Sequence, residues 1–426
     1  MIKTLRLIAL ALIVSVPSTA QMRMMSYNLL NFPDGNIAGR VDTLANIINY
    51  YQPRVLAIQE LQNEAGLVQI STMMNSLGYG NFTHAPFVAM QSDPGNPYKL
   101  QQGLLYDTDM LTLKSQSQII TEVRDINHYK LYLNNPDLQN GADTVFIHFF
   151  VTHLKSSTGF NNQAARTEMI QAFQYFSNIT LEENAAAIIC GDFNLYTNTE
   201  QAYQLLVNPT SGIAMVDPFA SYGNWTGSQF AHKEILTQST RVNQFANDGA
   251  GGGIDDRFDF ILYSESLSNA SSPIQYVENS FYSLGNNGTC YNASITSCAA
   301  GNAVPIDVLN SIYYMSDHIP QVCEFSIDLS LGIASKFKDD NSITFSGSNL
   351  ISANEIQFTV KNAQPGNCII RIFDLNGKKI WSTNTYCATA PNTYSVSTSD
   401  LSSSTYVIVV VHPDNSISTT KFVVQK

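Results

Sequence analysis

Charged side chains are scarce in this chain of 426 residues, because Asp, Glu, Lys and Arg together make up only 13%. Lys and Arg number 22 against 34 Asp and Glu, which gives a formal net charge of −12. A protein that holds a long polyanion by electrostatics alone is basic, so that class is excluded. Salt screens charges beyond about 8 Å, so a small anionic ligand remains compatible if a bound cation or a few basic groups offset the repulsion.

Long apolar runs are also lacking. The longest, Leu7 to Val16, follows Lys3 and Arg6 and is too short to cross a bilayer. Small residues up to Ala20 then favour cleavage before Gln21. This pattern is typical of a signal peptide, so we interpret residues 1–20 as one and expect an exported protein without a membrane span.

Cysteine is sparse, with six in the chain, and no His/Cys cluster has the spacing of a zinc site. Cys290 and Cys298 lie close together in a polar loop and are expected to form a disulfide, as suits an exported chain. A second pair, Cys368 and Cys387, lies in the C-terminal segment and could also bond. Cys190 and Cys323 fall in apolar strands, so we expect them to be buried thiols.

The length allows two or three domains, and the pattern changes at about residue 330. Residues 21–329 mix short apolar strands with two amphipathic helices, Val41–Tyr51 and Asn162–Ile179, which predicts a layered α/β or α+β core. Residues 330–342 are polar and read as a linker. Residues 343–426 contain strand and turn patterns, which predict a small β-sandwich. The strands predicted for the first domain are Met24–Leu29, Val55–Ile58, Gly103–Tyr106, Val145–Val151, Ala186–Cys190, Phe258–Leu262 and Ile319–Phe325.

Polar side chains gather at the ends of these predicted strands. Some follow a strand and others precede one, so antiparallel pairing of the two classes would bring them all to one edge of the core. The residues that follow a strand are Asn28, Glu60, His153, Asp192 and Asn194, and those that precede one are Asp259, Asp317 and His318.

These residue types suit phosphate-ester chemistry with a divalent cation. Carboxylate and amide oxygens, as in Glu60, are hard ligands that suit Mg²⁺, or alternatively Mn²⁺ or Ca²⁺. The imidazoles of His153 and His318 can act as acid and base near neutral pH. A carboxylate such as Asp259 can orient an imidazole and stabilise its charged form.

Each residue also has a structural alternative. A Gly–Asp pair such as Gly191–Asp192 after a strand is often a turn, and His153 alone is more often a hydrogen-bonded structural histidine. Asp259 could pair with its neighbour Arg257 instead of with an imidazole. The functional interpretation rests on all these residues falling at strand ends of one domain.

The first domain resembles the endonuclease/exonuclease/phosphatase superfamily, whose fold is that of pancreatic DNase. The resemblance lies in an ordered set of segments that covers nearly the whole domain. The segments are Ser26–Asn28, Leu56–Glu60, Thr152–Ser156, Gly191–Asn194, Arg257–Leu262 and Ser316–His318.

The resemblance implies a four-layer α/β sandwich with the site at one edge of two packed sheets. It implies that Glu60 holds the divalent cation with Asn28, Asp317 and Asp192, and that His318, paired with Asp259, activates the attacking water. It assigns positioning of water and phosphoryl oxygens to Asp192 and Asn194. It assigns to His153 either assistance to the leaving oxygen or stabilisation of the transition-state charge. The residues expected to bind the phosphate are Asn28, Asn194 and Lys155.

The chain departs from the DNase-type pattern at one place. Nuclease members have a glutamate that orients the second histidine, but Lys99 to Tyr106 contains no acid. The glycine-containing loop from Asn247 to Asp256 precedes Asp259 and is either a mobile edge of the cleft or a plain connection.

The C-terminal segment resembles the sorting domain of the type IX secretion system of Bacteroidetes-type bacteria. The resemblance lies in Ile372–Lys378, in Tyr406–Val411 and in the terminal Lys421–Val424, although Ser404 and Thr405 replace the usual glycine before the tyrosine. It implies export through the periplasm and outer membrane of a Gram-negative bacterium, with the secretion machinery as a partner. The alternative is a carbohydrate-binding or adhesive β-sandwich.

These features favour a secreted phosphodiesterase that acts on DNA or RNA and works as a monomer. The first alternative is a lipid phosphodiesterase such as a sphingomyelinase, for which the segment Phe219–Phe230, with Tyr222 and Trp225, would face the membrane. The second alternative is a surface adhesin on an inactive scaffold. The substrate and the number of metal ions are left open by the sequence.

Overall fold

A computed structural model describes two compact units, the first ending at Asp328 and the second formed by the C-terminal segment. Within the described part of the chain, no helix is both long and apolar enough to span a membrane. The predicted signal peptide, up to residue 19, and the predicted linker lie outside the described residues. The described residues are 20–94, 100–135, 138, 144–220, 223–226, 231–329, 343–345, 349–351, 354–361, 365–374, 378–388, 390–413 and 417–426.

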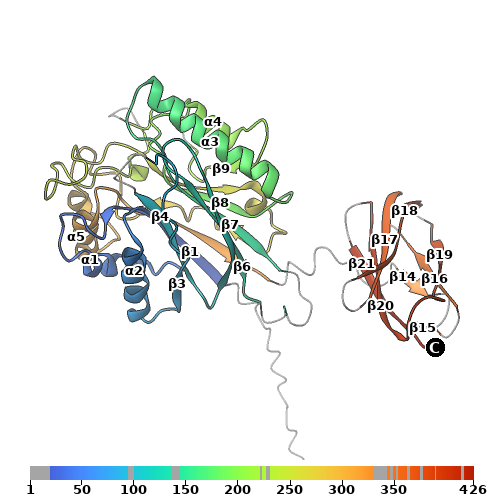
Figure 1. The fold of residues 1–426 in the computed structure, drawn as a ribbon. Helices are drawn as coiled ribbons and strands as arrows, with labels where there is room; N and C mark the ends of the chain where they lie inside the picture. Colours follow the sequence, from blue (N-terminus) through green and yellow to red (C-terminus); the bar gives the residue numbers. More distant parts are fainter. Residues whose placement is uncertain are drawn as a thin grey trace, which may run out of the picture. The chain divides into compact units, whose positions relative to one another are not determined.

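Two mixed sheets form the centre of the first unit (Figure 1). One has the order β11-β13-β1-β2-β4-β3, with β12 also paired to β13, and the other has the order β5-β6-β7-β8-β10-β9. The strands of the first sheet are β1 (Ala20–Phe32), β2 (Val55–Leu61), β3 (Phe82–His84), β4 (Gln101–Asp107), β11 (Ile274–Tyr276), β12 (Tyr282–Ser283) and β13 (Gln321–Ile327). The strands of the second are β5 (Leu111–Ile119), β6 (Ile126–Leu133), β7 (Phe146–His153), β8 (Ala187–Asp192), β9 (Met215–Val216) and β10 (Asp259–Ser264).

Helices cover the outer face of each sheet, which completes the predicted four-layer α/β sandwich (Figure 1). On one side lie α1 (Arg40–Tyr51), α2 (Glu64–Ser76) and α5 (Ile306–Met315), and on the other lie α3 (Phe160–Thr180) and α4 (Gln201–Val207). Phe173 of α3 packs edge-on against Phe150 of β7, so the apolar face of this helix covers the second sheet. Short 3₁₀ helices occur at Lys233–Ile235, Glu265–Ser268 and Ile295–Ala299.

Strand direction brings the polar strand ends together, as predicted. In the first sheet β1 runs parallel to β2 and antiparallel to β13, with Ala20 opposite Ile327 at one end and Ser26 opposite Gln321 towards the other. In the second sheet β7 runs parallel to β8 and antiparallel pairing joins β8 to β10. The carboxyl ends of β1, β2, β7 and β8 and the amino ends of β10 and β13 therefore share an edge.

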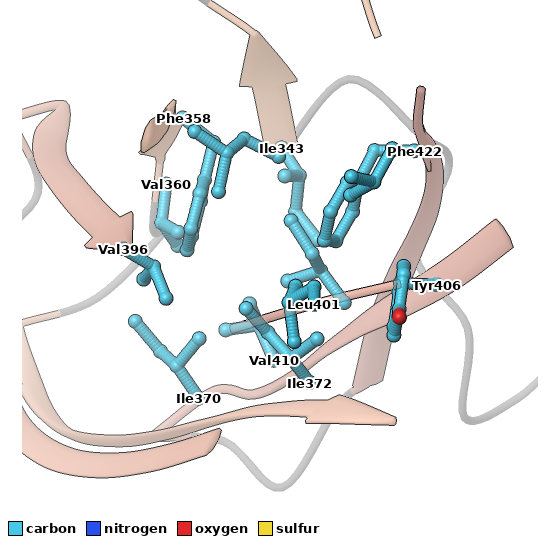
Figure 2. Close-up of a cluster of buried hydrophobic side chains, with 13 residues drawn as sticks. Ile343, Phe358, Val360, Ile370, Ile372, Val396, Leu401, Tyr406, Val410 and Phe422 are labelled. Carbon is cyan, nitrogen blue, oxygen red and sulfur yellow. The ribbon is translucent and has the colours of Figure 1, made fainter. Parts of the chain in front are cut away.

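The second unit is all β, as predicted. One sheet has the order β14-β16-β19 and the other the order β15-β21-β20-β17-β18. Alternate residues of β20, such as Ile408 and Val410, point into a core that also contains Phe358 and Phe422 (Figure 2). The strands are β14 (Ile343–Phe345), β15 (Leu350–Ile351), β16 (Glu355–Val360), β17 (Gly366–Asp374), β18 (Lys379–Cys387), β19 (Asn392–Ser397), β20 (Ser404–Val411) and β21 (Ile417–Val424).

One of the two suggested disulfides is present. Cys290 and Cys298 are bonded, with their Cα atoms 5.1 Å apart. Cys368 and Cys387 lie on the neighbouring strands β17 and β18 but are buried thiols, so that pairing was wrong. The two are diagonal rather than directly opposite, because Cys368 pairs with Thr385 and Cys387 with Gly366.

The segment suggested as a membrane-facing loop contains a buried anchor. Trp225 has 0% of its surface exposed and packs against the rings of Tyr203 and Phe260. Tyr222 lies outside the described residues. Trp225 is thus a core residue and cannot insert into a membrane.

Candidate active site

Three neighbouring strands of the second sheet place His153, Asp192 and Asp259 side by side. Asp192 is paired in register with His153 across the parallel β7–β8 ladder and with Asp259 across the antiparallel β8–β10 ladder. His153 Nε2 lies 3.4 Å from Asp192 Oδ2. The backbone N–H of Asn194 donates to Asp192 Oδ1 at 3.0 Å, so the turn after β8 holds this carboxylate in place.

His318 and Asp259 form the predicted pair. His318 Nδ1 lies 2.7 Å from Asp259 Oδ2, and both residues are buried. Arg257, the alternative partner of Asp259, instead donates two hydrogen bonds to Asp217, at 2.8 and 3.0 Å. With Nδ1–H donating to the carboxylate, the lone pair of His318 Nε2 is directed to the opposite side of the ring.

The first sheet contributes Asn28 and Glu60. Asn28 Nδ2 donates to Glu60 Oε1 at 3.1 Å and to Asp192 Oδ2 at 3.3 Å, and lies 3.4 Å from His318 Nε2. Its Oδ1 accepts from the N–H of Leu30, so the amide nitrogen rather than the oxygen faces Glu60. Asn28 thus joins the carboxylates of both sheets to the imidazole.

Backbone strain concentrates at this edge. Leu30, Asn31, Glu60 and Asn194 all have positive φ, between 48° and 59°. Non-glycine residues in this region cost about 1–3 kcal/mol each and persist where the surroundings over-determine them. The N–H of Asn31 donates to Glu60 Oε2 at 3.1 Å, so two of the strained residues hold each other.

The glycine-containing loop before β10 is a packed wall of the site. The N–H of Ala250 donates to Asp317 Oδ2 at 2.6 Å. Gly249 has φ +73°, and a Cβ there would lie 2.9 Å from Asp317 Cγ, so only glycine fits this approach. Asp248 accepts from Asn31 Nδ2 at 3.0 Å, which ties the loop to the end of β1.

A cleft of about 440 Å³ opens above these groups. Asn28 and Asp259 are buried beneath it. Lys155 lies on the loop after β7 but is not part of the lining, because its Nζ donates to the Ser156 carbonyl oxygen. The cleft is lined by Leu30, Asn31, Glu60, Leu100, Arg124, His153, Ser156, Ser157, Asp192, Asn194, Tyr196, Gln238, Asp248, Gly249, Phe258, Asp317 and His318.

The sequence profile of the Endonuclease/Exonuclease/phosphatase family matches residues 25–318. The chain belongs to this family. The profile of the Secretion system C-terminal sorting domain matches residues 352–425, which covers most of the second unit. No curated protein matches the chain.

Several solved structures of low sequence identity are similar to the chain. An endonuclease/exonuclease/phosphatase from Beutenbergia cavernae is 11% identical, with a TM-score of 0.43, over 95% of this chain and 99% of its own. The human Nocturnin catalytic domain with bound sulfate is 17% identical, with a TM-score of 0.44, over 72% of this chain and 95% of its own. The D. rerio TDP2 complexed with single-strand DNA product is 16% identical, with a TM-score of 0.45, over 72% and 99%.

Burial and neighbouring charges shift the pKa values of His318 and His153 in opposite directions. Burial alone would lower the pKa of His318, but the carboxylates of Asp259, Asp317 and Asp192 outweigh it and raise that pKa well above its usual value. Burial, reinforced by the positive charge of Arg124, lowers the pKa of His153 well below its usual value. At neutral pH His153 is therefore a neutral hydrogen-bonding group.

The departure from the DNase-type pattern has a visible consequence. Among the described residues, His153 Nδ1 is buried and finds no hydrogen-bond partner, where a glutamate would bind it in DNase-type members. The corresponding strand carries Gln101 and Gln102 instead. His153 is thus positioned by Asp192 and by burial rather than by an acid on β4.

The acidic groups fit a hard divalent cation better than a soft one. Within the described residues, no three His, Cys, Asp or Glu side chains form a ready-made metal cluster. Mg²⁺ needs only one or two carboxylates and keeps several waters. Burial first, and then the nearby charge of Asp317, raises the pKa of Glu60, so a cation placed between these carboxylates would relieve their repulsion. Asn28 would serve as an oxygen ligand only with its amide reversed.

Gln238, Arg124 and Tyr196 line the cleft but were not predicted. Gln238 Nε2 lies 2.7 Å from His318 Nε2 and 3.2 Å from Asp317 Oδ2. No motif marks Gln238, because it lies on an irregular loop. Arg124 precedes β6, which is antiparallel to β7, so the strand-end rule that found His153 would also have found Arg124.

Proposed function

We propose that this protein is a secreted, divalent-metal-dependent phosphodiesterase, and that it acts on nucleic acid. The observation that carries the proposal is the His318–Asp259 pair at 2.7 Å, with the opposite ring nitrogen of His318 facing Asn28 and Asp192 at the floor of the cleft. A base with this orientation, next to hard oxygen ligands, suits attack of water on phosphorus.

Each residue has a defined task in this mechanism. His318 Nε2 accepts a proton from the attacking water, while Asp259 holds the ring and stabilises the imidazolium that forms. Asn194 and Asp192 orient the water and the phosphoryl oxygens. As the new P–O bond forms and the bond from phosphorus to the leaving oxygen breaks, neutral His153 donates a hydrogen bond through its N–H to the leaving oxygen, which takes its proton from solvent water. Arg124 takes the phosphate-binding part first assigned to Lys155.

Glu60, with Asp317 and Asp192 near it, would hold Mg²⁺, with Mn²⁺ or Ca²⁺ as alternatives. When bound, such a cation neutralises charge on the phosphoryl oxygens and opposes protonation of His318. The sorting domain supports export to the cell surface or the medium of a Gram-negative bacterium through the type IX machinery. Family membership and the paired His318 and Asp259 disfavour an inactive adhesin.

The test offers purified protein plasmid DNA, RNA, sphingomyelin vesicles and a chromogenic phosphodiester, each with Mg²⁺ and with EDTA. We expect turnover of a nucleic acid and of the chromogenic ester, and none with EDTA. His318→Ala should lower kcat by about 10²–10⁴-fold. Turnover that survives EDTA, or an unchanged kcat in His318→Ala, contradicts the proposal. Turnover of sphingomyelin alone would favour the lipid phosphodiesterase.

A further inference from the structure

Tyr196 is an aromatic residue of the cleft lining and lies two residues after the Gly191–Asn194 turn in the chain. It is half-buried and lines the cleft together with Asn194 and His153. Its backbone is held at both ends, because its N–H donates to Glu200 Oε1 at 2.9 Å and its carbonyl accepts from the N–H of Trp225 at 2.8 Å.

The ring of Tyr196 packs against a buried ion pair. The guanidinium carbon of Arg166 lies 5.5 Å from the ring centroid, and the ring of Phe258 meets it nearly edge-on at 5.0 Å. Arg166 is fully buried and pairs with Glu200 at 2.8 Å. Its Nη1 also donates to the carbonyl oxygens of Lys155 and Ser157, so it joins the two loops that flank the cleft. The tyrosine is thereby a rigid aromatic wall.

Because the protein is negatively charged, a contact that does not depend on charge is important for binding a nucleic acid. The protein has a net charge of −12, and the Lys155 ammonium group donates to the Ser156 carbonyl oxygen rather than lining the cleft. Affinity for a polyanion from phosphate contacts alone would therefore be weak and strongly salt-dependent. Stacking of a base on an aromatic ring strengthens binding by about ten-fold or more and tolerates every base.

We propose that Tyr196 is a specificity-determining residue that stacks on a nucleobase beside the scissile phosphate, so that the preferred substrate is single-stranded nucleic acid. The inference rests on the proposed function, whose substrate class it specifies. In a duplex each base face is covered by its neighbours, whereas a single strand can present one base to a protein ring. A cleft of about 440 Å³ is in the size range of sites that enclose one small-molecule-sized group.

The experiment measures binding of a fluorescein-labelled single-stranded oligonucleotide to the full chain by anisotropy in EDTA, so that nothing is cleaved. Tyr196→Ala and Tyr196→Leu should each raise Kd about ten-fold, whereas Tyr196→Phe should stay near wild type. Leu retains apolar packing against Arg166 but has no π face, which separates stacking from a folding defect. The matched control is Tyr175→Ala, because Tyr175 is 69% exposed on α3 and does not line the cleft.

A second oligonucleotide of equal charge carries abasic sugars. Wild type should bind it about ten-fold more weakly than the base-containing strand, and Tyr196→Leu should bind both alike. Equal wild-type affinity for the two strands, no measurable affinity for either, or wild-type affinity in Tyr196→Leu each overturns the inference. If the chromogenic ester is still hydrolysed in that case, the proposed phosphodiesterase stands and only the assignment of Tyr196 fails. An absence of all turnover with Mg²⁺ would instead remove the proposed function.

Discussion

At the scale of single residues, the site depends on carboxylates crowded at one edge of two sheets. Glu60 is held by Asn28 Nδ2 and by the N–H of Asn31, at 3.1 Å each, and its own φ is positive. Structure so strained is retained where it positions a functional group. The carboxylate of Glu60 is therefore the group on which cation binding should depend most.

Replacing Glu60 by Gln should weaken the binding of Mg²⁺ without unfolding the chain. The amide keeps the shape of the side chain but loses the negative charge, so the Mg²⁺ concentration for half-maximal rate should rise at least about ten-fold. A Mg²⁺ titration of turnover measures this. Glu64→Gln, an exposed residue at the start of α2, is the control. An unchanged titration midpoint would remove Glu60 as a ligand.

Much of the site could be predicted because its residues end or begin strands. Asp192 and Asp259 follow this rule, and their direct pairing across β8 and β10 results from it. Gln238 could not be found this way, since a loop residue is placed by the packing of distant segments. Lys155 shows that the position of a residue in the chain does not fix its contacts. It follows β7, as the rule requires, but its ammonium group donates to the adjacent Ser156 carbonyl oxygen.

At the scale of elements, the parallel pairing of β7 with β8 requires a glycine at its end. Gly191 has φ +138°, and a Cβ there would overlap the carbonyl oxygen of Thr152 on the neighbouring strand. No rotamer change relieves an overlap with backbone. The pair can close beside His153 and Asp192 only if residue 191 has no side chain.

Gly191→Ala should lower the free energy of unfolding by about 3 kcal/mol or more, from strain and overpacking together. Gly78→Ala is the control, because Gly78 also has positive φ, +73°, but nothing lies within 4 Å of an added Cβ. It should lose about 1 kcal/mol. Urea denaturation of both variants separates the two costs, and equal losses would show that the contact with Thr152 is unimportant.

Two stacked histidines on β6 and β7 should make the stability fall with acid. His128 Nε2 and His148 Nδ1 lie 2.9 Å apart, both residues are buried, and the carboxylate of the exposed Glu182 lies 3.6 Å from His148 Nε2. Burial, aided by nearby positive charge, lowers the pKa of His128 to about 3 and that of His148 to about 4. The unfolded chain binds protons below pH about 6.5, while the native chain does not until about pH 4.

The contribution of these two histidines to the stability is therefore complete above pH about 6.5 and decreases as the pH falls towards 4, by up to about 1.4 kcal/mol per pH unit for each histidine. Burial raises the pKa of Asp192 and of Asp256 to about 7, and these two carboxyl groups act in the opposite direction over the same range. Urea midpoints at several pH values measure the slope. His128→Gln should make it shallower, whereas His232→Gln, at an exposed histidine, should not. The same slope in His128→Gln as in wild type would contradict this explanation.

The elements themselves were predicted unevenly. Seven strands at the middle of the two sheets and the helices α1 and α3 were predicted because each has a long apolar face or run, but β6, which also lies inside the second sheet, was missed. α2 was missed although its buried residues Leu67, Ile70 and Met74 recur at helical spacing, because the exposed apolar Val68 blurs the boundary of the apolar face. The edge strand β5 was missed because its residues are mostly exposed and polar.

At the scale of the whole molecule, the two units have separate cores. The last strand of the first, β13, pairs with β1, β11 and β12, all within that unit. The core of the second unit contains residues from Ile343 to Val424 only. We therefore expect the catalytic fold to be independent of the sorting domain, with residues 330–342 as the connection and a monomer as the working form.

Ending the chain after Leu329 should leave kcat and KM for the chromogenic ester unchanged but abolish export. Activity assays of purified protein and cell fractionation in a type IX-competent host measure the two effects. Full-length His318→Ala is the converse control and should be exported without activity. An aggregated or inactive truncated chain would show that the first unit needs the second.

The pairing of Ala20 with Ile327 determines at which end of the first unit a cell-surface attachment would begin. Asn28 lies eight positions further along β1 than Ala20. The first and last strand residues of this unit, Ala20 and Ile327, are therefore both about 25 Å from the active-site edge of the sheet, at its other end. A tether attached through the tail would leave from that end. The residue at which the tail begins and the cleft therefore lie at opposite ends of the first unit.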